Sequence, residues 1–504
     1  MSPAPHRLPW ANFLHVYQPA DQQRDILEAV IQQSYRPIFE RLKTDRGIRL
    51  TLNVTGALFE ILDTYGHRDL IDCLRRAGKE GRIEFTGSAK YHAFLPFLED
   101  DEIVRQIHLN TTTNRFYLGP SYRPRGFFPP EMAYKKELAR IVAGEGFEWI
   151  LLDEIACTGV PGEVDYTKIY RIKGTSLKAF FRERRLSNLI MSAVVRSSAT
   201  LLESMREDLA TKRYVVTAMD GETFGHHRPG LDRLLFEIFH TKQFKLVCMS
   251  DLLSMYPETL EIDPVRSTWA SSERDILKGV QFLSWSDPDN ILHRWQWKLQ
   301  RLVLTEVQAL PSSKPSHRRV RKQMDVALAS DHFWWASAKP WWSLEMIEDG
   351  AFRLLDTIRM IPGVGKKKLD LALHYYEKIV STAFDWQRTG KIRQMMAEQN
   401  EALRIPFKDR TVGRGGTERG VYAAFLHMMQ DLERKAARGG EYEKAILWRD
   451  AVMKMEHKLD IYDAINVIDL LRLEIPHERV EKTIEKYKEQ YRKIRGGQPE
   501  QRGS

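Results

Sequence analysis

Two acidic residues of the sequence follow separate β-rich runs and could act as a catalytic pair. Glu131 comes after Phe127-Phe-Pro-Pro130, where the prolines stiffen the backbone, and Asp220 ends the run Val215–Met219. Two carboxylates that face one cleft are sufficient for retaining glycoside hydrolysis, in which one attacks the anomeric carbon and the other donates and then removes a proton. Taken alone, Glu131 also fits a solvated loop glutamate and Asp220 a helix N-cap.

Several histidines also follow these runs, and zinc is the competing interpretation. His15, His92, His226 and His227 are good zinc ligands together with Asp220. However, no H-x-x-x-H or H-x-H spacing is present, and the adjacent pair His226-His227 would point its side chains apart. The three cysteines (Cys73, Cys157 and Cys248) are widely spaced without a C-x-x-C motif. We therefore expect no metal and no other cofactor, and hydrogen-bonding or structural roles for the histidines.

The elements that must position these residues alternate between short β-rich runs and amphipathic stretches from Trp10 to about Ser250. The candidate strands are Trp10–His15, Ile48–Val54, Ile83–Thr86, Arg125–Phe128, Trp149–Leu152, Ala179–Phe181, Tyr214–Met219 and Lys245–Met249. The helical stretches between them include Asp25–Thr44, Asp69–Glu80, Glu99–Leu118 and Lys136–Glu145. Because no G-x-G-x-x-G follows the first strand, this α/β pattern favours a closed or nearly closed β/α barrel over a doubly wound sheet.

Beyond about Trp269 the pattern becomes helical. Four long amphipathic helices are predicted over Ile276–Leu310, Ser316–Ala329, Leu344–Met360 and Leu369–Arg388. A Gly- and Arg-rich stretch from Arg404 to Arg419 resembles a linker, and Val421–Arg438 and Glu441–Leu459 form a predicted hairpin, followed by a charged helix to about Ile494. We therefore expect a barrel over residues 1–265, a helical domain over 266–400, and a linker with a C-terminal hairpin over 401–504.

Five ordered segments resemble the sequence motifs of glycoside hydrolase family 57. They are His15-Val-Tyr-Gln-Pro19, Glu84-Phe-Thr-Gly-Ser88 with His92, Phe127-Phe-Pro-Pro-Glu131, Asp220-Gly-Glu-Thr-Phe-Gly225 and Phe282-Leu-Ser-Trp-Ser-Asp-Pro-Asp-Asn290. The resemblance spans roughly residues 8 to 345. It implies an incomplete seven-stranded β/α barrel, (β/α)7, with a helical domain packed on it. It further implies a retaining enzyme acting on α-glucans, with Glu131 as nucleophile and Asp220 as acid/base.

The same resemblance suggests which residues bind substrate. Polar residues that follow the predicted strands would form a rim at the carboxyl ends of the barrel, where such folds hold their active sites. The candidates are His15, Gln18, Glu84, His92, Asp153 and Arg182, together with Trp269 and Trp285 as platforms for sugar rings. The motifs do not choose between amylase, 4-α-glucanotransferase, branching and pullulanase activities.

A second resemblance lies near the C-terminus. The segment Ala436-Ala-Arg-Gly-Gly-Glu-Tyr-Glu-Lys-Ala445, followed by Trp448-Arg-Asp450, is similar to the helical hairpin called the UVR motif in nucleotide-excision-repair proteins. This resemblance implies a protein partner or self-association through residues 421–459. An ordinary amphipathic hairpin remains the alternative.

Composition limits the class of protein. The chain has 504 residues, is 43% hydrophobic and carries a formal charge of +9. From Ile361 to Ser504 there are 28 Lys and Arg against 22 Asp and Glu, which leaves 49 against 46 for the first 360 residues. This small excess does not favour a nucleic-acid partner. The N-terminal segment lacks a signal-peptide pattern and no apolar run is long enough for a membrane span, so we expect a cytoplasmic protein.

Two other functions remain open at this stage. One is a non-catalytic glucan-binding or regulatory protein that uses its C-terminal hairpin to bind partners. The other is a metal-dependent deacetylase with a similar barrel. The pair of carboxylates argues against the first, and the histidine spacing argues against the second.

Overall fold

The structure is a computed structural model, and it divides the chain into two compact units. It describes residues 7–339, 341–395 and 417–457, and beyond these residues 471, 474–476, 479–480, 482–484 and 486–487. The first unit comprises Met1–His227 and Leu231–Met396, and the second comprises Arg228–Gly230 and Ala397–Ser504.

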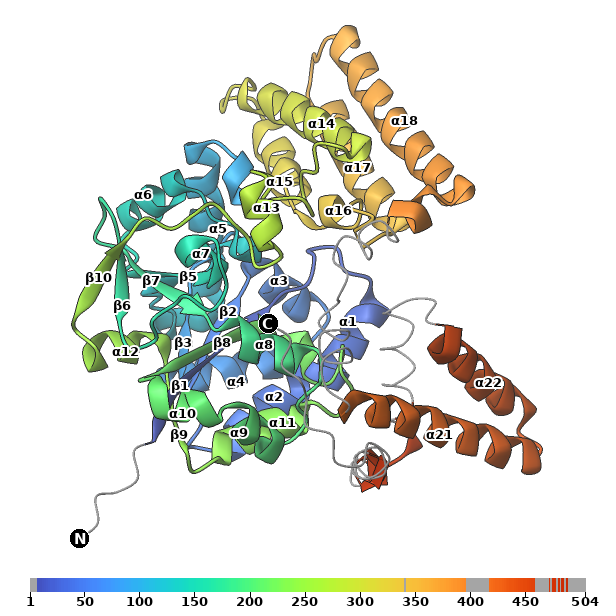
Figure 1. The fold of residues 1–504 in the computed structure, drawn as a ribbon. Coiled ribbons are helices and arrows are strands. Elements are labelled where there is room, and N and C mark those ends of the chain that lie inside the picture. Colours follow the sequence, from blue (N-terminus) through green and yellow to red (C-terminus); the bar gives the residue numbers. More distant parts are fainter. Residues whose placement is uncertain are drawn as a thin grey trace. The chain divides into compact units, whose positions relative to one another are not determined.

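The first unit contains a curled, mainly parallel set of strands (Figure 1). One sheet has the order β3-β2-β1-β8, with β9 also paired to β1, and the other has the order β10-β6-β7-β5-β4. The strands are β1 (Leu8–Val16), β2 (Leu50–Val54), β3 (Ile83–Phe85), β4 (Gly126–Phe127), β5 (Trp149–Asp153), β6 (Ile169–Ile172), β7 (Lys178–Arg182), β8 (Val215–Asp220), β9 (Phe244–Val247) and β10 (Thr259–Ile262). Only the β6–β7 pairing is antiparallel. A parallel bridge between Gly87 and Phe127 continues β3 towards β4.

Hydrophobic side chains cover both faces of these strands, as expected for parallel strands enclosed by helices. On β1, Ala11 and Phe13 belong to the inner core, whereas Trp10 and Leu14 pack in the outer core with the surrounding helices. The helices around the strands are α1 (Arg24–Val30), α2 (Arg36–Thr44), α3 (Gly56–Thr64), α4 (Arg68–Lys79), α5 (Asp100–Leu118), α6 (Lys136–Gly144), α7 (Ile155–Thr158), α8 (Arg184–Met191), α9 (Ser198–Ser204), α10 (Arg206–Thr211), α11 (Asp232–His240) and α12 (Met249–Met255). The alternation confirms the α/β class.

Short helical turns complete the loops that follow the strands. They are the π-helical turn η1 (Ile31–Tyr35) and the 3-10 turns η2 (Leu95–Phe97), η3 (Gly119–Ser121), η4 (Pro130–Met132) and η5 (Gly221–Thr223). Two strands were not predicted, β6 and β10. They are four residues each. β10 is largely exposed, whereas β6 is mostly buried and contains the partly exposed Arg171.

The remainder of the first unit is helical. Its helices are α13 (Glu273–Leu277), α14 (Ile291–Gln308), α15 (His317–Ala327), α16 (Asp331–Trp334), α17 (Leu344–Arg359) and α18 (Lys366–Thr389). The predicted single helix over Ile276–Leu310 was wrong, because Pro288 interrupts it and the Asn290 side chain caps α14 by accepting from the N–H groups of Leu292 and His293. Buried residues of α14 and α17 belong to the same hydrophobic core as the inner faces of the strands.

In the second unit, α21 (Thr417–Arg438) packs against α22 (Tyr442–His457) around Met429 and Trp448. The turn between the two helices contains Gly440, whose φ of +73° suits glycine. Residues 396–416, which include most of the predicted linker, lie outside the described residues, as does much of the predicted final helix.

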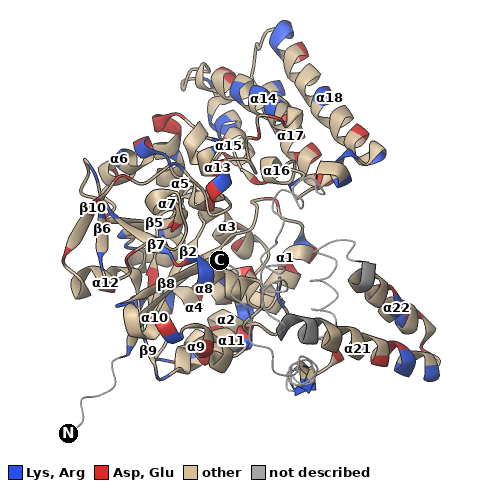
Figure 2. Ribbon diagram, viewed as in Figure 1, with Lys and Arg blue, Asp and Glu red and all other residues tan. Residues whose placement is uncertain are grey.

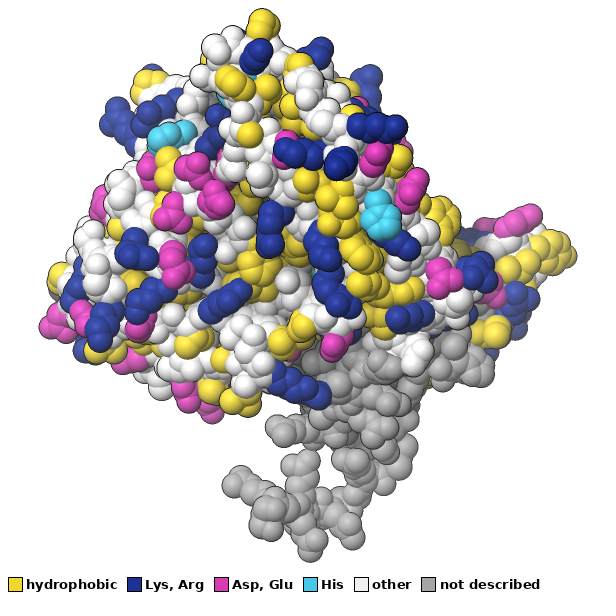
Figure 3. Space-filling model, turned by 90° about the horizontal axis from the view of Figure 1, so that it is seen from above, with side chains coloured by type: hydrophobic (Ala, Val, Ile, Leu, Met, Phe, Trp, Pro, Cys, Tyr) yellow, Lys and Arg dark blue, Asp and Glu magenta, His cyan; other side chains and the backbone are white. Residues whose placement is uncertain are grey.

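Charges of both signs are distributed over the outer helices of the first unit (Figure 2). In the view of Figure 3, hydrophobic side chains lie among Lys and Arg side chains. None of the helices within the described ranges is both long and apolar enough to span a membrane.

Candidate active site

The neighbouring strands β1 and β8 place two of the predicted residues side by side. His15 pairs in register with Asp220 near the carboxyl ends of these strands. His15 is buried, with Nδ1 2.8 Å from Oδ1 of Asn53 and Nε2 3.1 Å from Nε2 of His92. Burial lowers the pKa of His15 to about 4, although the hydrogen bond with Asn53 acts in the opposite direction. The imidazole is therefore neutral at neutral pH.

His92 joins the loop after β3 to this group. Its φ of 56° lies in the left-handed region, and its ring stacks on Tyr17 with 4.2 Å between the ring centroids. Nδ1 lies 3.2 Å from the Ser330 hydroxyl and 3.7 Å from Oε1 of Glu131. Burial, followed by the proximity of His15, holds the pKa of His92 well below its usual value. The two histidines thus form a neutral, hydrogen-bonded pair beside the Glu131 carboxyl.

Glu131 is held in an unusual conformation in η4, where its φ is 62°. The indole N–H of Trp269 donates to Oε2 over 2.8 Å, and the backbone N–H of Trp269 donates to the Glu131 carbonyl over 3.1 Å. Burial raises the pKa of Glu131 well above its usual value, and the nearby charges of Asp220 and Asp331 raise it further, whereas the Trp269 hydrogen bond lowers it. The side chain retains 15% exposure, so it can meet a ligand.

Asp220 is the last residue of β8. Burial raises its pKa to about 6, while the positive charge of Arg182 lowers it. No described residue donates a hydrogen bond to its carboxylate, which leaves both oxygens available to a substrate. The Glu131 carboxyl lies beside His92, His92 contacts His15, and His15 pairs in register with Asp220, so the structure brings the two predicted carboxylates into one site.

Arg182 and Asp153 end the adjacent strands β7 and β5 and bind each other. Arg182 donates to Oδ2 of Asp153 over 2.9 Å, to the Ala218 carbonyl over 2.7 Å and to Oδ1 of Asn188 over 2.8 Å. Both side chains are almost fully buried. These contacts fix the end of β8 and place a positive charge near Asp220, whereas direct contact of either residue with a sugar is not visible in this arrangement.

Gln18 belongs to a second carboxyl cluster beside Asp220. Its amide donates to Oε1 of Glu222 over 3.1 Å, and the hydroxyl of Tyr35 donates to the same oxygen. Burial, then the charge of Asp220, raises the pKa of Glu222 to about 7. Neither Glu222, although it stands within the Asp220-Gly-Glu222 motif, nor Tyr35 was predicted from the sequence as a site residue.

A third carboxyl reaches the site from the helical region. Asp331, at the start of α16, accepts a hydrogen bond of 2.8 Å from the hydroxyl of Tyr17. Burial raises the pKa of Asp331 to about 6, although the Tyr17 hydrogen bond lowers it. No local pattern in the sequence distinguishes this residue, because an aspartate that follows a serine is also common at the start of an ordinary helix.

Two of the predicted site residues, Glu84 and Trp285, lie away from the group around Glu131 and Asp220. Glu84 precedes Thr86 by two residues on the β3 segment, and its carboxylate accepts from the backbone and hydroxyl of Ser250 and from Thr51. It therefore lies deeper in the barrel, towards the amino ends of the strands. Trp285 is fully buried and stacks on Phe94 with 5.1 Å between the ring centroids, so no face of its indole is exposed to a sugar. Trp269 remains partly exposed beside Glu131.

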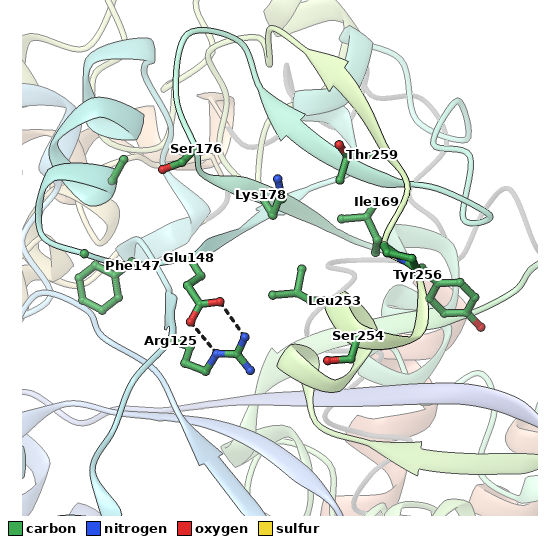
Figure 4. A pocket seen from close by; sticks show the side chains of 13 residues that line it. Arg125, Phe147, Glu148, Ile169, Ser176, Lys178, Leu253, Ser254, Tyr256 and Thr259 are labelled. Carbon is green, nitrogen blue, oxygen red and sulfur yellow. Dashed lines mark hydrogen bonds and ion pairs between the residues drawn. The ribbon is translucent and has the colours of Figure 1, made fainter.

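One cavity lies at the opposite end of the strands. It has a volume of about 510 Å³ and is lined by residues at the amino ends of β4, β5 and β7, including the paired side chains of Arg125 and Glu148 (Figure 4). A much smaller cavity of about 40 Å³ lies beside Tyr17 and Asp331. Neither Glu131 nor Asp220 lines the larger cavity. Within the described part of the chain, no group of three His, Cys, Asp or Glu side chains is arranged to hold a metal ion.

Comparisons with known proteins agree with this geometry. The model of glycosyl hydrolase family 57 matches residues 2–263. The chain is 26% identical over 283 residues to an alpha-amylase of Pyrococcus horikoshii, covering 53% of this chain and 44% of that protein. It is 25% identical over 274 residues to a 4-alpha-glucanotransferase of Thermococcus litoralis, covering 52% and 41%. The chain thus spans less than half the length of either relative.

The fold is also shared with a solved structure. The crystal structure of a branching enzyme from Pyrococcus horikoshii superposes with a TM-score of 0.55 at 16% sequence identity, covering 78% of this chain and 94% of that one.

Proposed function

The chain belongs to glycosyl hydrolase family 57, and on this premise we propose that it cleaves or transfers α-glucan chains with retention of configuration at the anomeric carbon. The observation that carries the proposal is the chain of contacts at the carboxyl ends of the strands, which joins Glu131 to His92, His92 to His15, and His15 through the β1–β8 register to Asp220. The similarity to an alpha-amylase and a 4-alpha-glucanotransferase supports α-glucan as the substrate class.

In the first step Glu131 attacks the anomeric carbon while Asp220 donates its proton to the glycosidic oxygen. A bond forms between the Glu131 carboxylate and the sugar, the glycosidic bond breaks, and the shortened chain leaves with the proton. The pKa of Asp220 near 6 allows it to hold this proton in mildly acidic solution, and no described residue donates a hydrogen bond to its oxygens, so they can reach the leaving group.

Glu131 has to be ionised to act as nucleophile, although burial and two neighbouring carboxylates raise its pKa. Two contributions offset this cost. The Trp269 N–H donates to the carboxylate and so favours its charged form, and the positive charge that develops at the anomeric carbon in the transition state adds a counter-charge. Neutral His15 and His92 add hydrogen-bonding capacity without a charge of their own.

In the second step Asp220 removes a proton from an acceptor hydroxyl, and the acceptor oxygen displaces Glu131 from the anomeric carbon. Water as acceptor gives hydrolysis, and a sugar hydroxyl gives transfer or branching. The products formed from maltoheptaose and amylose distinguish these outcomes. Shortened chains alone identify an amylase, longer and shorter chains a transferase, and new branch points a branching enzyme.

The residue roles are tested with Glu131→Gln and Asp220→Asn. We expect each variant to lose at least about 100-fold in kcat, because each removes one group of the covalent step, whereas Glu148→Gln, in the exposed pair with Arg125, should behave like wild type. Azide should then restore turnover of an activated aryl α-glycoside in alanine variants. Glu131→Ala should release the β-glycosyl azide and Asp220→Ala the α-glycosyl azide. The reversed pattern would exchange the two roles, and glucan binding without any turnover by wild type would indicate a binding protein.

We also propose a barrel topology, domain boundaries and a cellular location for the chain. The strands β1 to β5, β7 and β8 would form the incomplete (β/α)7 barrel, supported by the Gly87–Phe127 bridge and by the hydrogen bond from Glu183 N–H to the Val216 carbonyl. The domains would span residues 1–265, 266–400 and 401–504. Three buried free cysteines are compatible with the reducing cytoplasm proposed as its location.

The C-terminal hairpin is proposed to bind a protein partner or a second copy of the chain. Tyr442, Ile446 and Met453 are exposed on one face of α22, which supports a role in binding. Light scattering after size exclusion would test self-association through a concentration-dependent mass. Wild type and an Ile446→Lys variant that both remain monomers would contradict self-association.

A further inference from the structure

Arg184, the first residue of α8, holds the backbone of the segment that contains Trp269. Its Nη2 atom donates to the carbonyl of Trp269 over 2.7 Å and to the carbonyl of Ser271 over 2.6 Å. Hydrogen bonds from a guanidinium are charge-assisted and have a fixed geometry, because the group is planar and always protonated. One side chain therefore holds this segment at two points.

Two successive carboxylates fix Arg184 in turn. The Nε atom of Arg184 lies 3.5 Å from Oδ1 of Asp153, the last residue of β5, and the backbone N–H of Arg184 donates to Oε2 of Glu154 over 3.0 Å. The Asp153 side chain is fully buried, and Oε1 of Glu154 accepts from the backbone N–H of Gly162 over 2.8 Å. Both the main chain and the side chain of Arg184 are thus anchored at the end of β5.

Asp153 also binds the arginine that holds the strand of the acid/base residue. Its Oδ2 accepts from Arg182, which donates to the carbonyl of Ala218, two residues before Asp220 on β8. The two oxygens of one buried carboxylate therefore face two arginines. Arg182 leads to the strand of Asp220, and Arg184 leads to the segment of Trp269.

The segment of Trp269 contacts Glu131 directly. The backbone N–H of Trp269 donates to the Glu131 carbonyl over 3.1 Å, and the indole N–H donates to Oε2 over 2.8 Å. Residues 268–271 form neither a helix nor a strand. The direction of the indole therefore depends on side chains that bind the backbone of this segment, as Arg184 does.

We propose that Arg184 is a positioning residue for the nucleophile, which holds the Trp269 segment so that the indole N–H meets the Glu131 carboxylate. Arg184 forms no bond to substrate and acts only through Trp269. Asp153 fixes the guanidinium of Arg184, and through its two arginines it ties both catalytic residues to the end of β5. This inference rests on the proposed function, because it takes Glu131 as the nucleophile.

Arg184 is the member of this group that can be replaced with the least disturbance. Its side chain retains 16% exposure, and Asp153 keeps Arg182 as a partner when Arg184 is removed. Replacement of Asp153 would instead leave the charge of Arg182 buried and without its carboxylate partner, which is strongly destabilising. The experiment therefore changes Arg184.

The test compares Arg184→Met and Arg184→Lys with wild type on maltooligosaccharides. Methionine removes the donor, so we expect kcat/KM to fall about 10-fold. Lysine keeps a charged donor near the same carbonyls and should recover part of this loss. In a Trp269→Phe background, Arg184→Met should cause little further loss, because both changes remove the same hydrogen bond to Glu131. A loss as large as in the wild-type background would overturn the proposal.

The pH profile separates this role from a general loss of structure. Since the Trp269 hydrogen bond lowers the pKa of Glu131, Arg184→Met should move the acid limb of kcat/KM to higher pH, as Trp269→Phe does. The other groups that face this carboxyl are His92, Asp220 and Asp331, and the hydrogen bonds and ion pairs of Arg184 involve none of them. A loss of activity with an unmoved acid limb would contradict the proposal.

The choice of substrate separates the nucleophile from the acid/base residue. With an aryl maltooligosaccharide that has a good leaving group, the loss in Arg184→Met should persist, because the departing group needs no proton but still needs the nucleophile. A loss that vanishes on this substrate would mean that Arg184 acts on Asp220 instead, and the proposal would fail.

A measurement without turnover tests the same contact. The indole N–H resonance of Trp269, identified by its absence from the spectrum of Trp269→Phe, should respond to the ionisation of Glu131 in wild type and lose this response in Arg184→Met. An unchanged response in Arg184→Met would overturn the proposal. If wild type turns over no α-glucan, the proposed function fails, whereas this resonance still decides whether Arg184 positions Trp269.

A matched control is Arg171→Met. Arg171 on β6 also binds a carboxylate and a backbone carbonyl, because it donates to Oε2 of Glu261 over 2.6 Å and to the Thr175 carbonyl over 3.4 Å. None of these groups belongs to the site around Glu131, so kcat/KM and the pH profile should stay unchanged. Equal losses in Arg171→Met and Arg184→Met would contradict a specific role of Arg184.

Discussion

At the scale of single residues, the Glu131 carboxyl is a group whose ionised form is disfavoured by its surroundings. Burial and the charges of Asp220 and Asp331 favour its protonated form, and the indole N–H of Trp269 is the hydrogen-bond donor that favours its ionised form. Trp269 therefore combines two properties, a partly exposed ring beside the reacting carboxylate and a donor to that carboxylate. A variant that retains the ring face and removes the N–H separates these two properties.

Trp269→Phe should lower kcat/KM on maltooligosaccharides by about 10- to 100-fold, because the lost hydrogen bond is buried and charge-assisted. Since that hydrogen bond lowers the pKa of Glu131, its loss raises the pKa, and the acid limb of the pH profile should move to higher pH. The measurement is kcat/KM between pH 4 and 9. A rise in KM with an unmoved acid limb would instead assign sugar stacking as the only role of Trp269. Trp342→Phe, which loses an exposed hydrogen bond to Gln387, is the control.

At the scale of elements, the strands deliver residues to one edge, and the loops after them determine how those residues meet. The β1–β8 register places His15 beside Asp220, whereas Glu131 reaches the site only because η4 adopts a left-handed turn at that residue. The loop after β8 depends on Gly225, whose φ is +112° and whose α-carbon faces the Gln33 carbonyl. A single methyl group added at Gly225 is therefore expected to displace this loop.

Gly225→Ala should reduce both stability and activity. The left-handed φ costs a non-glycine residue about 1–2 kcal/mol, and the overlap with Gln33 forces η1 and the loop apart. Gly162→Ala is the matched control, because Gly162 also has a positive φ of 88° but no atom near the added methyl group. Thermal unfolding and kcat/KM of both variants give the comparison. We expect similar stability losses from the backbone but a loss of activity only for Gly225→Ala, and equal activities would contradict the importance of this contact.

At the scale of the molecule, the first unit buries titratable groups whose pKa values move in opposite directions. Burial raises those of Asp220, Glu222 and Asp331 to between about 6 and 7, and lowers those of His293 and His332 to about 4 and 3. The carboxyls contribute less to the free energy of unfolding as the pH rises from their pKa in the unfolded state, near 4, to their pKa in the folded state. The histidines contribute less to the free energy of unfolding as the pH falls below about 6.5, their pKa in the unfolded state. The stability of the unit is therefore limited on both sides of mildly acidic pH.

Asp331→Asn should stabilise the protein at pH 8 by about 1–2 kcal/mol relative to wild type and have little effect at pH 4. The reason is that the buried carboxyl is ionised at pH 8 in the folded state, while the amide oxygen still accepts from Tyr17. Denaturant unfolding at both pH values measures the difference. An equal effect at the two pH values would contradict the pKa assignment. Asp385→Asn, in an exposed pair with Arg388, should show no such dependence on pH.

The sequence predicted eight of the ten strands that the structure describes, because most strands enclosed by helices have buried apolar residues in succession. It also predicted Glu131, Asp220, His15 and His92 as neighbours, since the carboxyl ends of parallel strands share one edge. It did not predict β6, a short strand that contains Arg171, or β10, which is largely exposed. The interruption of the helix before α14 was missed although Pro288 and Asn290 mark it.

What the sequence determined by itself was the class of fold, the family and the pair of carboxylates, because strand periodicity and the motif residues are local properties of the chain. Only the tertiary structure decided which side chains meet. Asp331 lies about 200 residues beyond Glu131 and is brought close by the packing of α16, and Tyr35 reaches Glu222 through a π-helical turn. Glu84 and Trp285 stand in the matching motifs, yet the direction of their side chains places them in the barrel interior and in an aromatic core. Side-chain direction and the packing of distant segments depend on the whole fold, so a local sequence pattern does not predict them.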